Sequence, residues 1–296
     1  MSRITIQDLK RWKQESRRWV CLTSYDAPSA RVLAAAEVPV VLVGDSLGNV
    51  ILGHGSTIPV TMDDMVRHTA AVRRGAPDLF VVGDMPFLAA QISDEEAVRN
   101  AGRLIQEGGA DAIKLEGGGP RASTVRRIVE AGIPVMGHLG LTPQNATQLG
   151  GYKVQGCDPQ EALRISQDAR ALEEAGAFAI VLECVPVELA AAITRVATVP
   201  IIGIGAGPDV DAQVLVYHDL VGWSGDFKPR FVRRYARVEE TMIEAVRSFQ
   251  QDVVQGDFPS DSESFRGSQA STPVEDSAVE VLPDDLELEQ ERQTSG

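Results

Sequence analysis

The sequence predicts a (β/α)8 TIM barrel, preceded by one N-terminal helix and followed by an acidic tail. About eight short runs rich in valine, isoleucine and leucine alternate with helix-like segments along the first 259 of the 296 residues. Several of these runs end on an aspartate, a glutamate, a lysine or a histidine. A charge is costly in an apolar setting, so such an ending indicates a strand that leaves the core and enters a site. In (β/α)8 barrels the C-terminal strand ends carry the chemistry.

The strands are expected at the apolar runs, in the order 19–26, 38–46, 78–85, 111–117, 133–140, 178–184, 199–207 and 214–219. Each run is short and aliphatic, as expected for strands that are covered on both faces. A doubly wound open sheet is the alternative. The barrel is favoured because the count is near eight and because no GxGxxG motif follows the first strand.

The helices are expected between these runs. The first covers 4–16 with Thr5 as a plausible N-cap, and the others cover 27–36, 62–74, 94–107, 119–131, 159–175, 186–196 and 238–254. Ser93 and Glu96 predict a capping box. Two long intervals rich in glycine and polar residues, 47–60 and 139–158, are predicted to be loops that cover the active face.

Charge divides the chain into a catalytic domain at 1–259 and a tail at 260–296. The tail has ten acidic and two basic residues, so it carries −8 of the total charge of −14. It has few large apolar residues, and we predict that it is disordered because it cannot bury enough surface to offset its ordering entropy. The acidic balance argues against nucleic acid or an anionic membrane surface as the main partner.

Cysteine usage and the N-terminus predict a soluble, cytoplasmic protein. Cys21, Cys157 and Cys184 have the spacing of neither a disulfide framework nor a zinc site. They are interpreted as small buried or neutral residues in a reducing compartment. The first 15 residues lack the apolar region of a signal peptide, and no run approaches the roughly 18 apolar residues of a membrane helix.

Strand alternation predicts that the charged residues converge. Side chains along a strand alternate between the two faces. If Asp45 faces the barrel axis, Val41 and Val43 share its face, and Val40 and Leu42 face the helices. The same rule brings a whole set of polar residues to the axis, namely Asp45, Asp84, Lys114, Glu116, His138 and Glu183.

Asp45 and Asp84 end neighbouring strands, and the sequence leaves two interpretations open. Two carboxylates at one depth repel unless a cation or a proton lies between them. Mg²⁺ accepts one or two carboxylates together with water and substrate oxygens, so a magnesium site is one interpretation. The other is that one or both aspartates cap helices.

Lys114 and Glu116 point the same way and can form an ion pair. This pair is either structural or part of a clamp for a substrate carboxylate or enolate. His138, before a turn, is either a structural residue or a site residue. Glu183 is a carboxylate largely among apolar residues, which suits a general base near neutral pH.

The remaining candidates are a glycine-rich segment and three histidines. The glycine-rich segment 203–207 follows the seventh strand, where barrels often bind phosphate. Small residues there could equally allow a close approach of ligand or backbone. His54, His68 and His218 have no usable partner spacing and are interpreted as structural.

Longer motifs carry a family resemblance. In chain order they are LTSYDAPSA (22–30), VLVGDSLGN (41–49), GHGSTIPVT (53–61), HTAAVRRGAP (68–77), GDMPF (83–87), KLEGG (114–118), GHLGLTPQ (137–144), GGYKVQG (150–156), LECVPVELA (182–190) and IGIGAG (202–207). From about residue 3 to about residue 259 the chain resembles the ketopantoate hydroxymethyltransferases. The acidic extension after Phe265 lies outside the resemblance.

The resemblance implies a homodecameric (β/α)8 barrel with Mg²⁺ at the strand ends. Members transfer a one-carbon unit from 5,10-methylenetetrahydrofolate to 3-methyl-2-oxobutanoate. The product is 2-dehydropantoate, formed in the first committed step of pantothenate and coenzyme A biosynthesis. The small-molecule substrates and self-association are therefore expected of this chain, and the folate contacts are not tied to a motif.

Roles carried over by motif are as follows. Asp45 and Asp84 match metal-associated, substrate-binding aspartates, and Glu116 lies near the metal through water. Ser46, Lys114 and His138 match the substrate-contacting positions of the family. Glu183 matches the position of the proposed base.

The chemistry expected from these roles begins with loss of a proton from the carbon next to a ketone. Mg²⁺ chelated by the keto oxygen and the carboxylate would stabilise the enolate, and Lys114 would add positive charge there. Glu183 would take the proton, and the enolate carbon would attack the one-carbon donor. No phosphate takes part, so the resemblance argues against the phosphate interpretation of 203–207.

The sequence leaves two rival functions open. One is another Mg²⁺ barrel enzyme acting on 2-oxo acids, of the phosphoenolpyruvate mutase and isocitrate lyase type. The other is a non-catalytic binding protein on a barrel, which predicts missing site residues. None of the carried-over residues is missing.

Overall fold

The structure, a computed structural model, describes residues 3–225 and 229–266 and contains a closed barrel of eight parallel strands. Each strand pairs with the next in chain order, and the last pairs with the first. The strands are β1 (Trp19–Thr23), β2 (Val40–Val43), β3 (Phe80–Asp84), β4 (Ala112–Glu116), β5 (Val135–Gly140), β6 (Ala179–Glu183), β7 (Ile201–Ile204) and β8 (Ala212–Leu215). The predicted (β/α)8 barrel is confirmed.

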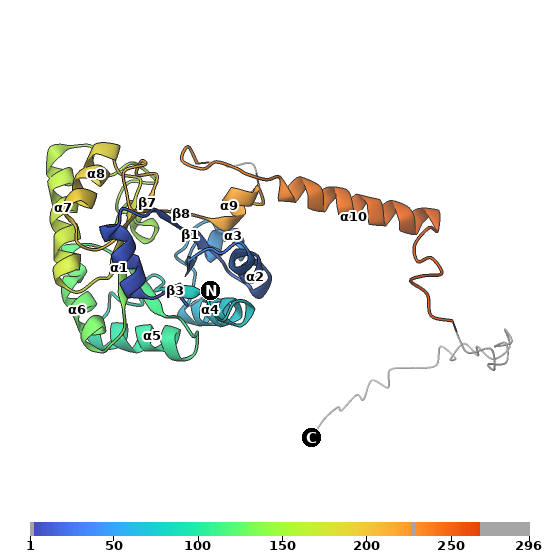
Figure 1. Cartoon of the computed structure of the whole chain (residues 1–296), viewed down its shortest axis with the longest axis horizontal. Coiled ribbons are helices and arrows are strands. Elements are labelled where there is room, and N and C mark those ends of the chain that lie inside the picture. Colours follow the sequence, from blue (N-terminus) through green and yellow to red (C-terminus); the bar gives the residue numbers. More distant parts are fainter. Residues whose placement is uncertain (1–2, 226–228, 267–296) are drawn as a thin grey trace, which may run out of the picture. The chain divides into compact units, whose positions relative to one another are not determined.

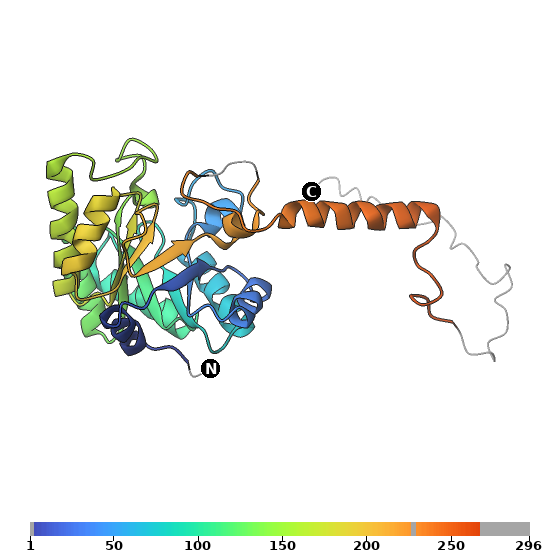
Figure 2. The same cartoon turned by 45° about the horizontal axis from the view of Figure 1, so that its top comes forward.

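Helices surround the barrel (Figures 1 and 2). The helices of the described residues are α1 (Ile6–Gln14), α2 (Ala27–Ala35), α3 (Leu47–Val50), α4 (Met62–Gly75), α5 (Asp94–Gln106), α6 (Ala122–Glu130), α7 (Pro159–Glu174), α8 (Val187–Val196), α9 (Tyr217–Val221) and α10 (Val238–Gln255), of which α2 and α4 to α8 cover the outside of the barrel. Two short 3₁₀ turns, η1 (Gly119–Arg121) and η2 (Pro143–Asn145), lie in the loops after β4 and β5.

Three local predictions are wrong. The eighth strand ends at Leu215, and α9 begins at Tyr217, whose backbone N–H donates to Thr23 Oγ1 (3.0 Å). The helix predicted over 119–131 starts with a separate 3₁₀ turn that contains Pro120. At α5, Ser93 Oγ accepts the Glu96 N–H (3.1 Å), but the reciprocal bond of a capping box is not formed.

Inward and outward side chains follow the predicted alternation on four of the five strands considered. Inside the barrel lie Phe80, Val82, Ala112, Met136, Ala179 and Val181, whereas Val81, Ile113, Leu115, Ile180 and Leu182 pack toward the helices. On β2 the prediction is wrong, since Val40 and Leu42 face inward and Val41 and Val43 face outward. Asp45 still reaches the axis because β2 ends at Val43, so strand alternation does not continue through Gly44.

Strand register explains how charged side chains pair at the C-terminal ends. Asp84 is the partner of Lys114 across β3 and β4. Glu116 is the partner of His138 across β4 and β5. Paired residues on neighbouring strands lie side by side, so the closed barrel itself places these groups in contact.

Helix α1 packs against the barrel interior. A capping box at Thr5 and Asp8 starts the helix. Its buried residues Leu9 and Trp12 join a cluster with Trp19, Cys21 and other inward side chains of the strands. Lys13 Nζ lies 2.7 Å from Asp211 Oδ2 just before β8. The predicted N-terminal helix therefore contributes to the barrel core.

The chain divides into two compact units, Met1–Thr241 and Met242–Gly296. Helix α10 begins at the end of the first unit, and none of its residues is buried. The predicted boundary at 259/260 falls within the second unit, and most of the predicted disordered tail (267–296) lies outside the described residues. None of the described helices is long and apolar enough to cross a membrane.

Candidate active site

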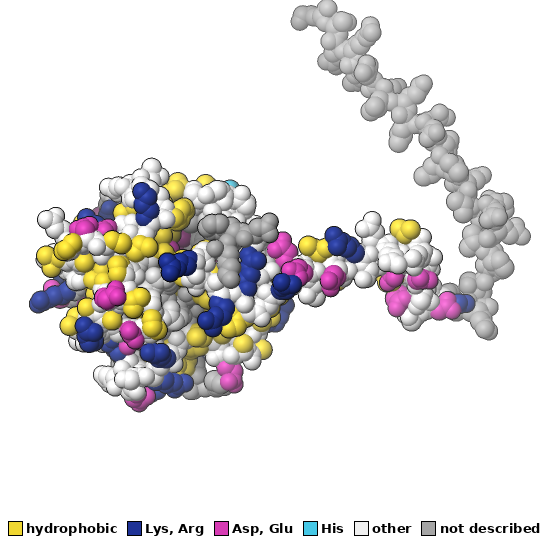
Figure 3. All heavy atoms as spheres, turned by 90° about the horizontal axis from the view of Figure 1, so that it is seen from above, with side chains coloured by type: hydrophobic (Ala, Val, Ile, Leu, Met, Phe, Trp, Pro, Cys, Tyr) yellow, Lys and Arg dark blue, Asp and Glu magenta, His cyan; other side chains and the backbone are white. Residues whose placement is uncertain are grey.

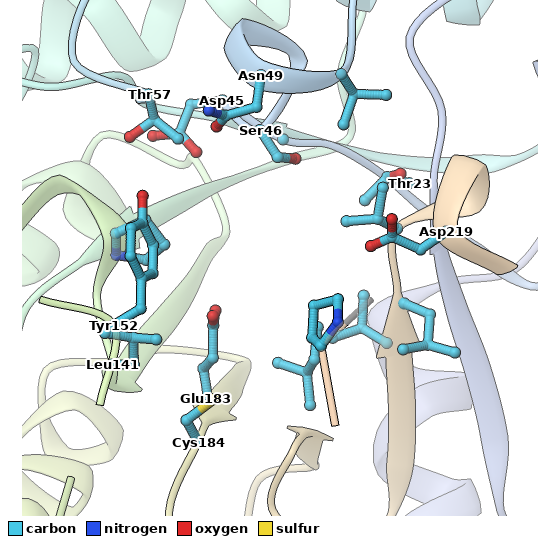
Figure 4. Close-up of a pocket in the computed structure, with 18 of the residues that line it drawn as sticks. Thr23, Asp45, Ser46, Asn49, Thr57, Leu141, Tyr152, Glu183, Cys184 and Asp219 are labelled. Atoms are coloured by element: carbon cyan, nitrogen blue, oxygen red, sulfur yellow. The ribbon is translucent and has the colours of Figure 1, made fainter. Parts of the chain in front are cut away.

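A cavity of about 930 Å³ lies at the C-terminal ends of the strands (Figure 4). Its walls contain every residue that the sequence singled out for the site, namely Asp45, Ser46, Asp84, Lys114, Glu116, His138 and Glu183. The two long intervals predicted to cover the site contribute Asn49, Thr57, Leu141 and Tyr152. The structure thus brings the predicted residues together, while their chemical roles remain predictions.

Lys114 forms a buried ion pair with Asp84. Its Nζ atom lies 2.6 Å from Asp84 Oδ2 and 3.8 Å from Glu116 Oε1. The predicted pairing with Glu116 is therefore the longer of two contacts. All three side chains are at most 5% exposed. Removing one member of a buried ion pair is strongly destabilising, because it leaves an uncompensated charge in the interior. Each of these charged groups therefore depends on the others for its place in the interior.

His138 bridges two glutamates. Its Nδ1 atom lies at hydrogen-bond distance from Glu116 Oε1 (3.2 Å), and its Nε2 atom lies 3.2 Å from Glu183 Oε2. The second contact has the distance of an ion pair without the alignment of a hydrogen bond. Glu183 is the more accessible acid, with 16% of its side chain exposed against 1% for Glu116.

Gln144 connects the acids and was missed in the sequence. Its Nε2 atom donates to Asp45 Oδ2 (2.9 Å), and its backbone N–H donates to Glu116 Oε2 (3.1 Å). The Asp45 backbone N–H points at Asp84 Oδ2 (3.3 Å). A neutral side chain in a loop gives no charge signal, and only its place in the GHLGLTPQ motif could have indicated it.

Tyr25, also missed, holds Ser46. Its hydroxyl lies 2.8 Å from Ser46 Oγ, and its side chain is fully buried. His68 Nδ1 contacts the Tyr25 carbonyl (2.6 Å), and the His218 ring lies 5.6 Å from the Tyr25 ring. The two histidines thus pack around a residue that positions a cavity side chain.

Burial governs the electrostatics of the acids. It raises the pKa of Asp45 well above its usual value, and the negative charge of Asp84 raises it further. Burial also raises the pKa of Asp84, although Lys114 opposes the shift. For Glu116, burial is outweighed by the hydrogen bond and charge of His138, and the pKa is lowered. Two neighbouring aspartates with raised pKa values favour a bound cation or a proton between them.

The two neighbouring glutamates favour the protonated form of His138. Burial and the charge of Lys114 lower its pKa, but the close contacts with Glu116 and Glu183 and the negative charge of Glu116 outweigh them and raise it to about 9. A protonated His138 is a donor at both ring nitrogens. It therefore holds the two glutamates as a cation.

The aspartate pair fits a magnesium ion. Asp84 Oδ1 is buried and has no hydrogen-bond partner among the described residues. Both Glu116 oxygens are engaged, by His138 and Gln144, which fits a contact through water. In 3–225 and 229–266, no group of three or more His, Cys, Asp or Glu side chains is arranged to hold a metal. Two carboxylates completed by water and substrate oxygens are a coordination that Mg²⁺ accepts.

Packing accounts for the glycines after β7. Gly205 and Gly207 have φ angles of +63° and +81°. A Cβ atom on Gly205 would lie 3.0 Å from the Phe231 ring and 3.3 Å from Cys184 Sγ, and one on Gly207 would lie 2.7 Å from Val187. Of the two interpretations left open, close approach explains both positions.

Comparison with known proteins gives a family. A family model described as ketopantoate hydroxymethyltransferase matches residues 3–261. A 3-methyl-2-oxobutanoate hydroxymethyltransferase of Moorella thermoacetica is 55% identical over 265 residues, covering 90% of this chain and 98% of that protein. A protein of the same name from Thermus thermophilus is 54% identical over 263 residues, covering 89% of this chain and 100% of that protein.

Solved structures with a similar fold are more distant in sequence. A phosphonopyruvate hydrolase in complex with oxalate and Mg²⁺ has a TM-score of 0.58 at 13% identity, covering 89% of this chain and 93% of that one. A 2,3-dimethylmalate lyase has a TM-score of 0.56 at 16% identity, covering 90% and 91%. These two support the barrel fold alone.

Proposed function

Since the chain belongs to the ketopantoate hydroxymethyltransferase family, we propose that it converts 3-methyl-2-oxobutanoate into 2-dehydropantoate. The one-carbon unit comes from 5,10-methylenetetrahydrofolate, and one water supplies the hydroxyl oxygen. The observation that carries the proposal is the meeting of an aspartate pair, a buried lysine and the Glu183–His138 pair in one cavity. That set suits removal of a proton next to a ketone and stabilisation of the enolate.

Glu183 is the proposed base. It is more exposed than Asp45, Asp84 and Glu116, and His138 lies 3.2 Å from its Oε2 atom. The proton leaves the carbon next to the ketone and goes to Glu183, and that carbon forms the new bond to the one-carbon unit. The His138 cation fixes the direction of the carboxylate, which places the base before the substrate binds.

The negative charge that develops on the substrate faces positive groups. Lys114 Nζ and the hydroxyl of Ser46, held by Tyr25, belong to the same wall. A Mg²⁺ ion, which Asp45 and Asp84 would hold with Glu116 acting through water, would supply Lewis-acid polarisation of the keto group. A buried lysine costs no reorganisation as charge develops, because it is already oriented by Asp84.

The test is an assay of the full chain with Mg²⁺, 3-methyl-2-oxobutanoate and the folate donor. We expect 2-dehydropantoate by mass spectrometry, with product lost on omission of the folate and strongly reduced by chelation of the metal. Cleavage of another 2-oxo acid, with no folate-dependent product, would contradict the proposal and favour the lyase-type rival.

Self-association into a homodecamer is proposed from the family resemblance. Helix α10 supports it, because large apolar side chains on the helix are exposed in the single chain, namely Met242, Ile243, Val246, Phe249, Val253 and Val254. A monomer rarely exposes so continuous an apolar set. Light scattering coupled to gel filtration measures the assembly, and a monomer at micromolar concentration would contradict it.

A further inference from the structure

The side chains of Asp45, Asp84, Lys114 and Glu116, here called the carboxylate–lysine cluster, line only part of the cavity. The remaining wall comes from β7, β8 and the segments that follow them, and it is lined by Ile204, Val214, Leu215, Val216, Asp219, Trp223 and Phe231. Figure 4 shows Asp219 across the cavity from Tyr152, with Glu183 on the wall between them. At about 930 Å³ the cavity is near the upper end of the roughly 300–1,000 Å³ range of ligand sites, far more than a five-carbon acid needs.

Asp219 is a carboxylate without an assigned role. It extends from α9 into the cavity (Figure 4) and lies next to apolar side chains. In the described parts of the chain, its side chain has neither a hydrogen bond nor an ion pair. Figure 4 shows it apart from Asp45, beyond Ser46, so it does not belong to the proposed metal site. A carboxylate that faces a cavity and bonds to no described side chain can accept two parallel N–H donors from a ligand.

Trp223 forms a rigid flat surface beside Asp219. Gly222 ends α9 in the left-handed conformation (φ +71°), and a Cβ atom there would lie 2.4 Å from the Ala236 carbonyl oxygen. In this turn the backbone N–H of Trp223 donates to the His218 carbonyl oxygen (2.8 Å). The centroids of the Trp223 and His218 rings are 4.9 Å apart, and the ring planes meet at 32°. Trp223 lines the cavity with 42% of its surface exposed. An indole fixed in this way is a stacking surface for a flat ring.

We propose that Asp219, Trp223 and Phe231 form a donor compartment that binds the pterin ring of the reduced folate. This inference rests on the proposed function. The amino-pyrimidinone edge of a pterin presents an amino group and a ring N–H side by side, which a carboxylate accepts as a pair. Trp223 stacks on the ring, and Phe231, packed against Gly205, supplies further apolar surface.

Charge at the exposed part of the cavity fits the rest of a folate. Lys153 and Arg230 line the cavity and are exposed, and Figure 3 shows basic side chains spread over this face among apolar ones. The glutamate tail of a folate carries carboxylates that such cations attract. The oxo acid, in contrast, gains nothing from Asp219, whose negative charge repels its carboxylate. The two substrates are therefore assigned to opposite sides of Glu183.

Two reactions distinguish the donor compartment from the part of the cavity that binds the oxo acid. Exchange of the acidic C–H proton of 3-methyl-2-oxobutanoate in deuterium oxide needs the base and the metal but no folate, and proton NMR measures it. Product formation needs both substrates. We expect Asp219→Asn to raise the KM for the folate by roughly 10- to 100-fold, the range for hydrogen bonds to a charged group, with exchange unchanged. Trp223→Leu should raise the same KM and also leave exchange unchanged.

Asp209→Asn is the matched control, because Asp209 is an exposed carboxylate of the β7–β8 connection that does not line the cavity. It should change neither reaction. An unchanged folate KM in both Asp219→Asn and Trp223→Leu would overturn the donor compartment. Loss of exchange in both variants would also overturn it, since the residues would then support the whole site. A wild-type protein that exchanges the proton but makes no folate-dependent product would overturn the proposed function itself.

Discussion

Asp45 and Asp84 lie side by side but are held by different partners. Asp84 bonds to the buried Lys114, whereas Asp45 accepts a hydrogen bond from the neutral Gln144. Replacing Asp84 would leave a buried lysine without its closest counter-charge, which typically costs about 3–5 kcal/mol of stability. Asp45 is therefore the better position for testing metal binding separately from folding.

Asp45→Asn should weaken the magnesium dependence of activity. The amide keeps the size of the side chain but removes one of two charges facing the cation. We expect the Mg²⁺ concentration for half-maximal activity to rise by about tenfold or more, as for loss of one charge-assisted contact. The measurement is a metal titration after chelation, with thermal unfolding as the control for folding. An unchanged titration curve would remove Asp45 from the metal site.

Glu183→Gln should lower turnover while substrate binding persists. General base catalysis contributes roughly 10²- to 10⁴-fold, and the amide cannot take the proton. The KM for the oxo acid should change little, because the contacts assigned to binding come from other residues. Steady-state kinetics and proton exchange measure the two effects. Weaker binding with full turnover at saturation would contradict the role of base.

Sequence reasoning found the charged members of the cavity because each follows an apolar run. Asp84, Lys114 and His138 also obey strand alternation, which makes their direction predictable. Gln144 and Tyr25 were missed, since a neutral side chain after a strand resembles many loop residues. Their importance depends on contacts with residues 99 and 21 positions away in the chain.

At the level of elements, strand register determines which charges meet. The pairs Asp84–Lys114 and Glu116–His138 are cross-strand partners, and register is not visible in one strand's sequence. On β2, all four residues are apolar and buried, so the pattern could not distinguish inward from outward positions. The prediction there was wrong because it counted back from Asp45, which lies beyond the strand.

Helix α1 should stabilise the barrel without taking part in catalysis. Leu9 is fully buried among inward strand residues, and Leu9→Ala should cost about 2–5 kcal/mol of unfolding free energy. Gln7→Ala, at an exposed position of the same helix, is the control and should cost little. Chemical denaturation measures both, and turnover at low temperature should be unchanged. Equal stability of the two variants would show that α1 does not support the core.

At the level of the whole molecule, the family match covers 3–261 and the site lies within Met1–Thr241. The catalytic domain is therefore proposed to be 1–259, with α10 included for assembly. Deleting 266–296 should leave kcat/KM within about twofold, because that segment offers no apolar core. Deleting 238–296 is the contrasting variant and should disrupt self-association. A large loss of activity in the shorter deletion would contradict the proposal.

The unequal exposure of the two ends of the cavity has a kinetic consequence. The Asp84–Lys114 end is closed off from solvent, whereas Trp223 and Lys153 remain exposed. With the pterin in the donor compartment, a small acid could no longer reach the inner end. We therefore expect compulsory addition, with the acid first and the folate second, so that a dead-end folate analogue should inhibit uncompetitively toward the acid. Noncompetitive inhibition by the analogue toward the acid would mean that entry is random, and competitive inhibition would mean that the two ligands exclude each other from one site.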